Sequence, residues 1–81
     1  MVRSIRLRLA DIITEIRSIQ AALGHLSFKE FESNRIVRAA IERGIEIISE
    51  ASRHLPDTFE DANPELPWRR IADIGNVLRH A

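Results

Sequence analysis

The feature that most constrains the fold is a regular spacing of aliphatic residues near the start of the chain. These residues are separated alternately by four and three positions, and they are Ile5, Leu9, Ile12, Ile16, Ile19 and Leu23. At ~100° of rotation per residue, this spacing places all of them in one stripe along an α-helix. The pattern predicts a helix from Ser4 to Leu23 that ends at Gly24, because glycine readily adopts the positive φ found after many helices.

A second and longer helix is predicted from Arg35 to Leu55. The same spacing recurs at Val37, Ile41, Gly44, Ile48, Ala51 and Leu55. Further apolar residues widen the arc to about half of the circumference, whereas a surface helix needs a stripe of only ~100°. We therefore expect this helix to pack against two neighbours, or against one neighbour and a second subunit. Gly44 is expected to permit a close helix approach, since glycine inside a helix costs about 1 kcal/mol relative to alanine.

The sequence also predicts where the connecting segments begin and end. Ser27–Glu30 forms a capping box that starts a short helix, which ends near Ser33 or Asn34. Pro56 is expected to stop the long helix, and the segment 57–60 is a second box-like start for about one helical turn. Pro67 suits the first turn of a last helix that runs to His80.

No strand pattern occurs in the chain, so the predicted fold class is all-α, an up-and-down helical bundle. We expect a single domain over residues 1–81. Three main helices make an incomplete bundle, and a fourth helix after Ala81 or a partner subunit is expected to complete it. A last helix that stops without a cap also suggests that the domain is truncated at its C-terminus.

The composition narrows the class of protein further. The chain has no cysteine, and its twelve basic residues balance twelve acidic residues. A net charge of zero gives no overall attraction to nucleic acid, so any RNA binding must depend on a local patch or a dimer cleft. No apolar run approaches the ~20 residues that span a bilayer. Asp11 and Glu15 interrupt the first apolar segment, and we expect a cytoplasmic protein with no membrane partner.

Chemically capable residues gather on the last helix. Arg69, Asp73 and Asn76 lie within ~40° of His80 on a helical wheel, and the aliphatic residues Ile71, Ile74 and Leu78 lie opposite. His80 is therefore expected to face solvent and to titrate near neutral pH. Alternatively, a histidine in the last turn simply complements the helix dipole. His25 and His54 are interpreted as structural.

Other kinds of site are disfavoured, and we expect no metal and no cofactor. The histidines are scattered, and neither a zinc-binding spacing nor a glycine-rich phosphate loop occurs. The solvent-exposed face of the long helix carries a row of carboxylates, at Glu42, Glu46 and Glu50. Carboxylates spaced in this way usually stay solvated or pair with arginines, here Arg38 and Arg53.

Three stretches resemble the HepT-like branch of the HEPN domain proteins. They are Leu9–Ile16, Ala40–Ala51 and Pro64–Ala72, the last continuing into Asn76–His80. The resemblance implies a helical bundle similar to HEPN domains and to the substrate-binding subunits of nucleotidyltransferases. It also implies a homodimer that acts as a metal-independent endoribonuclease toxin on RNA, neutralised by a cognate minimal nucleotidyltransferase antitoxin.

The resemblance also assigns site residues. His80 matches the family's catalytic histidine, and Asn76 matches the asparagine that follows its arginine. The position of that arginine holds Gly75, and Ser49 stands where the family has a glycine. The missing charge would come from Arg79 or Arg70 of a partner subunit. Gly75 favours an alternative in which the protein is a non-catalytic partner or substrate-binding subunit of a nucleotidyltransferase.

Overall fold

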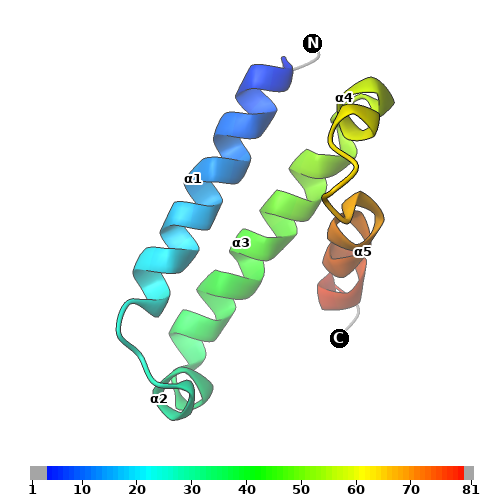
Figure 1. Cartoon of the computed structure of the whole chain (residues 1–81). Coiled ribbons are helices and arrows are strands. Elements are labelled where there is room, and N and C mark those ends of the chain that lie inside the picture. The colour runs from blue at the N-terminus through cyan, green and yellow to red at the C-terminus, as the bar shows by residue number, and fades with distance from the viewer. Residues whose placement is uncertain (1–3, 80–81) are drawn as a thin grey trace.

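Five helices form the part of the chain that the structure describes. The structure is a computed structural model, and it describes residues 4–79 except the side chain of Arg79. The helices are α1 (Ile5–Leu23), α2 (Phe28–Ser33), α3 (Arg35–Arg53), α4 (Asp57–Ala62) and α5 (Trp68–Arg79). The long helices α1, α3 and α5 run up and down in turn, with α3 between the other two (Figure 1). The all-α up-and-down architecture predicted from the sequence is therefore confirmed.

The capping residues fix the helix ends as the sequence predicts. The Ser27 hydroxyl accepts a hydrogen bond from the Glu30 backbone N–H at 3.1 Å, and the Ser27 N–H donates to the Glu30 carboxylate at 2.9 Å. The backbone N–H of Ser27, together with its hydroxyl, lowers the pKa of Glu30. Asn34 caps α3 by accepting from the Val37 N–H at 3.0 Å. Gly24 follows α1 with a φ of +44°.

Two predicted features of the helix ends differ from the structure. Helix α3 ends at Arg53 rather than Leu55, because the residue before a proline is biased away from helical dihedrals. Helix α4 begins after Pro56 and has no side-chain cap, so the predicted capping role of Asp57 is wrong. Helix α5 begins at Trp68, directly after Pro67, and the Pro67 carbonyl accepts the first helical hydrogen bond from the Ile71 N–H at 3.0 Å.

Helices α1 and α3 pack closely where Gly44 removes a side chain. Gly44 is buried, and a Cβ atom built on it would lie 3.1 Å from Cδ1 and Cγ1 of Ile19. The close approach predicted at Gly44 is thus confirmed. Yet no residue of α1 is fully buried, and Ile16 in the middle of its stripe remains 43% exposed. The aliphatic stripe of α1 is therefore only partly covered by α3.

Helix α3 also packs against α5, which confirms the prediction of two neighbours for its wide apolar arc. An apolar cavity of about 260 Å³ is lined by residues of α1, α3 and α5, and by the segment around α4. Phe59 and Trp68 meet edge to face in this region, with their ring centroids 5.9 Å apart. The Trp68 indole N–H donates to the Asn63 carbonyl at 2.9 Å, which fixes the connector that leads into α5.

No helix within residues 4–79 is both long enough and apolar enough to cross a bilayer.

The packing at Gly44 predicts a steric response to substitution. We expect Gly44→Val to lower the free energy of unfolding by about 2 kcal/mol, because its branched side chain would overlap Ile19 of α1. Thermal and chemical denaturation would measure the change. Ala40→Val, on an exposed position one turn earlier in α3, is the matched control and should cost less than ~0.7 kcal/mol. Equal stabilities of the two variants would contradict the packing argument.

Candidate functional site

The structure describes only some of the predicted site residues. Asn76 and Arg70 are both exposed on α5, as are Asp73 and Arg69, which share the predicted wet face. His80 and the side chain of Arg79 lie outside the described residues. The proposed grouping of Asn76 with His80 therefore stays a prediction.

The face that α5 turns toward α3 differs from the helical-wheel prediction at one residue, Ile74. Ile74, which was expected to point inward, is 39% exposed, whereas Gly75 is buried. Ile71 and Leu78, which were also expected to point inward, are half-buried, so the inward face holds Gly75 together with these two residues. A glycine takes this place because a polar side chain of α3 needs the space that a side chain at position 75 would fill.

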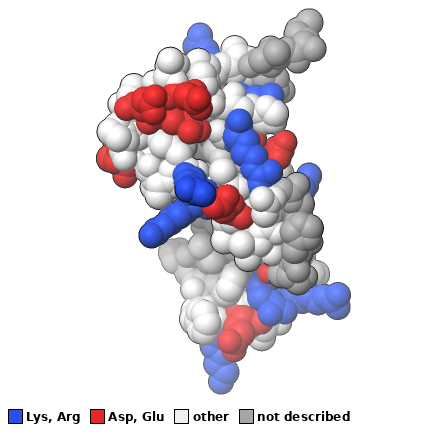
Figure 2. Space-filling model, turned by 90° about the vertical axis from the view of Figure 1, so that its right-hand side faces the viewer, with Lys and Arg blue, Asp and Glu red and all other residues white. Residues whose placement is uncertain are grey.

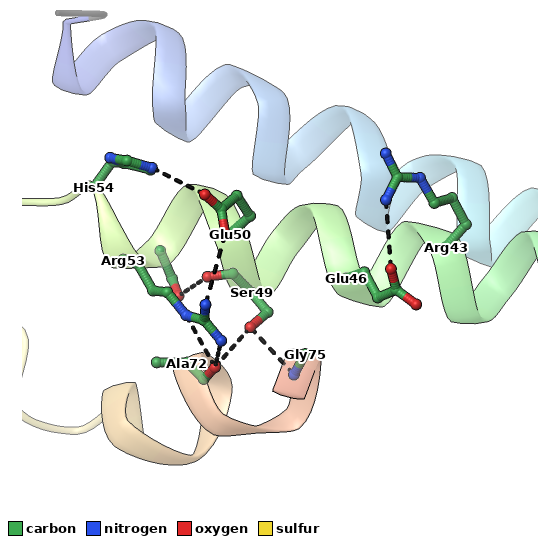
Figure 3. Close-up of polar contacts among 9 residues, drawn as sticks. Arg43, Glu46, Ser49, Glu50, Arg53, His54, Ala72 and Gly75 are labelled. Carbon is green, nitrogen blue, oxygen red and sulfur yellow. Dashed lines mark hydrogen bonds and ion pairs between the residues drawn. The ribbon is translucent and has the colours of Figure 1, made fainter. Parts of the chain in front are cut away.

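That side chain is Ser49, which is only 1% exposed. Its hydroxyl donates to the Ala72 carbonyl at 2.8 Å and accepts from the Gly75 backbone N–H at 3.2 Å (Figure 3). A Cβ atom built on Gly75 would lie 2.5 Å from the Ser49 hydroxyl oxygen and 2.9 Å from its Cβ. Ser49 and Gly75 therefore fit together as a pair, and neither tolerates a larger partner in this arrangement.

A guanidinium group lies against the same carbonyl. Nε and Nη2 of Arg53 donate to the Ala72 oxygen at 3.2 and 2.6 Å. Nη1 of Arg53 lies 3.7 Å from the Glu50 carboxylate, which also meets Nε2 of His54 at 3.2 Å (Figure 3). The predicted pair of Glu50 with Arg53 is confirmed. The contact of Arg53 with α5 was not predicted, because it joins residues 19 positions apart in the sequence.

These residues border a polar cavity of about 240 Å³ between α3 and α5. Its lining consists of Arg43, Glu46, Ser49, Glu50, Arg53 and Gly75. The prediction that Glu46 lies on the solvent-exposed face of α3 is wrong. Its side chain is only 24% exposed and pairs with Arg43 at 3.4 Å, and it lines one cavity with Gly75 of α5 and another with Asp11 of α1. Arg38, the other predicted partner of the row of carboxylates, forms no ion pair among residues 4–79.

The cavity combines two guanidinium groups with two carboxylates. Figure 2 shows basic and acidic side chains next to each other in the middle of the face turned toward the viewer. Guanidinium groups bind phosphate well because their N–H groups form a planar fork. Within the described part of the chain, no three histidine, aspartate or glutamate side chains are grouped so as to hold a metal ion. The cavity therefore offers guanidinium N–H groups to an anion, and its two carboxylates oppose one.

Comparisons with known proteins identify the family. The sequence profile described as Ribonuclease HepT-like matches residues 12–81. A Thermococcus cleftensis protein named "Probable ribonuclease HepT" is 36% identical over 81 residues, covering all of this chain and 74% of the relative. A Methanocaldococcus jannaschii protein named "Putative RNase MJ1380" is 31% identical over 78 residues, covering 96% of this chain and 72% of the relative. No solved structure matches significantly.

The chain belongs to the HepT-like ribonuclease family. The resemblance stated from its sequence is thereby confirmed.

The fit between Ser49 and Gly75 predicts a non-additive pair of substitutions. Gly75→Ala should lower the free energy of unfolding by about 1–3 kcal/mol, because the added Cβ overlaps Ser49. Ser49→Gly alone should also destabilise, since it removes the hydrogen bonds to Ala72 and Gly75. The double variant should be more stable than the sum of the two effects implies. Strict additivity in chemical denaturation would show that the two residues do not compete for one space.

Proposed function

We propose that this protein is a metal-independent endoribonuclease of the HepT-like toxin class and that it cuts RNA beside the contact between α3 and α5. The observation that carries the proposal is the polar cavity at Gly75, where two arginines border the backbone next to Asn76. Membership of the HepT-like ribonuclease family supports the same reaction class. Because the chain has no net charge, the local arginines are the groups that would attract a phosphate.

The proposed chemistry is transesterification within RNA. The imidazole of His80 accepts the proton of a ribose 2′-hydroxyl, whose oxygen then forms a bond to the adjacent phosphorus. The bond from phosphorus to the 5′-oxygen breaks, and that oxygen takes up a proton from water as it leaves. Asn76 orients the phosphate, and a guanidinium group stabilises the negative charge that builds on its oxygens. Arg79 and Arg70 are candidates for this charge from a second subunit.

The proposed assembly is a cytoplasmic homodimer that a cognate minimal nucleotidyltransferase neutralises as its antitoxin. Large aliphatic side chains remain exposed on all three long helices, among them Ile13 on α1, Ile36 on α3 and Val77 on α5, which are 48%, 82% and 60% exposed. The apolar cavity between α1, α3 and α5 adds a further uncovered surface. A second subunit would cover such surfaces and bring two copies of the last helix together.

The catalytic assignment predicts the effect of removing one imidazole. His80→Ala should abolish cleavage of single-stranded RNA, and Asn76→Ala should reduce it. Cleavage should persist in excess chelator, because no step requires a metal ion. Gel electrophoresis of end-labelled RNA would measure the products. His25→Ala is the matched control, since His25 lies in the loop between α1 and α2. Unchanged cleavage by His80→Ala would refute the assignment.

The assembly proposal predicts a mass of twice 9.3 kDa in light scattering. Ile16→Glu, which places a charge in the lining of the apolar cavity, should shift the population toward the monomer. Ser18→Glu introduces the same charge at an exposed position of α1 and should leave the dimer intact. Circular dichroism would verify that both variants keep their helices. A monomeric unmodified protein would rule out the proposed dimer.

One observation favours a second candidate function. Gly75 offers no side chain at the position where the family's arginine is expected, which suits a non-catalytic partner or substrate-binding subunit of a nucleotidyltransferase. Such a subunit would bind the nucleotidyltransferase without cutting RNA. The cleavage assay separates the two functions, because an intact RNA in the presence of the folded protein favours the binding subunit.

A further inference from the structure

We propose that Arg53 of α3 binds the RNA phosphate at this site, in the space next to Gly75 of α5. The inference rests on the proposed function and assigns the phosphate-binding cation to a helix that the sequence alone did not indicate. It follows from where the Arg53 guanidinium lies, how it is held and which charges surround it.

The guanidinium group lies beside the empty side-chain position of Gly75. A Cβ atom built on Gly75 would be 3.6 Å from Nη2 of Arg53. A cation on α3 therefore occupies the region into which a side chain at position 75 of α5 would extend. Ser49 fills the remaining space from the same helix, so α3 supplies both the packing and the positive charge at this point.

The orientation of Arg53 is fixed by α5. Its Nε and Nη2 groups both donate to the Ala72 carbonyl, which holds the planar fork in one direction. The side chain is 29% exposed and lines the polar cavity, so a ligand in the cavity can reach it. Nη1 and Nη2 each carry a second N–H group in addition to the one directed at Ala72 or Glu50. A phosphate oxygen is an acceptor suited to those N–H groups.

The charged groups around Arg53 determine how strongly it would bind a phosphate. Glu50 lies 3.7 Å from Nη1, which is longer than the 2.7–2.9 Å of a charge-assisted hydrogen bond. A phosphate would therefore displace a weak contact. Arg43 approaches the cavity from the same helix, with its side chain 72% exposed and paired to Glu46. The two carboxylates oppose an anion, so Glu50→Gln should tighten binding several-fold.

The first experiment measures binding without cleavage. The probe is a short single-stranded RNA with 2′-O-methyl groups, which lacks the hydroxyl that the proposed reaction requires. Arg53→Gln should weaken binding by about tenfold, the loss expected for a charge-assisted hydrogen bond. The slope of log affinity against log salt should fall by about 0.7, because one phosphate contact is lost. Arg53→Lys should keep that slope with intermediate affinity. Arg17→Gln, on an exposed position of α1, is the control.

A relocation variant separates phosphate binding from a purely structural role for Arg53. The triple variant Ser49→Gly, Gly75→Arg and Arg53→Gln moves the guanidinium from α3 to α5 while making room for its side chain. We expect it to regain affinity and salt slope relative to Arg53→Gln. Unchanged binding by Arg53→Gln, or a folded triple variant that binds no better than Arg53→Gln, would overturn the inference.

Cleavage of unmodified RNA distinguishes this inference from the proposed function. If the protein binds the probe through Arg53 but cuts no RNA, the ribonuclease proposal fails and the assignment of Arg53 stands. If it cuts RNA and Arg53→Gln leaves kcat/KM and the salt slope unchanged, the ribonuclease proposal stands and the assignment of Arg53 fails. Both measurements use the same protein preparations, with circular dichroism as the check on folding.

Discussion

The position of α5 depends on one backbone carbonyl. The Ala72 oxygen accepts hydrogen bonds from the Ser49 hydroxyl and from two nitrogens of Arg53. The Gly75 N–H donates a hydrogen bond to the Ser49 hydroxyl. Buried aliphatic residues are few among residues 4–79, namely Ile41, Ala51 and Leu55. Because hydrophobic burial is non-directional, it cannot by itself fix the rotation of a helix. Directional polar contacts therefore set which face of α5 meets α3.

Local sequence signals were sufficient to predict where the helices lie. Which face of α5 meets α3 depends on tertiary contacts that local signals do not encode. Capping residues such as Ser27 and Asn34 act within a few positions, so their roles were predictable. The wide apolar arc of α3 correctly indicated two neighbours. The wheel placed Ile74 inward, however, because periodicity treats an aliphatic residue as the centre of a buried face. It could not anticipate that Ser49, 26 residues earlier, would select Gly75 instead.

The same contact connects two departures from the family pattern. Ser49 replaces an expected glycine and Gly75 replaces an expected arginine, and the structure places the two residues against each other. In sequence they are unrelated differences, whereas in space one substitution requires the other. The position where an arginine is expected holds Gly75, which lies beside the guanidinium of Arg53. Position 75 therefore has no charged side chain of its own, but a guanidinium group from α3 lies next to it.

Trp68 is the single tryptophan of the chain, and it lies in the first turn of α5. Its indole is bonded to the Asn63 carbonyl and abuts the ring of Phe59. Trp68 also lines the apolar cavity with residues of α1 and α3, so detachment of α5 would change the environment of the indole while leaving most helical backbone hydrogen bonds intact. Intrinsic fluorescence consequently observes the docking of α5, and far-ultraviolet dichroism observes helix content. Comparing the two signals therefore distinguishes loss of the packing of α5 from loss of its helical structure.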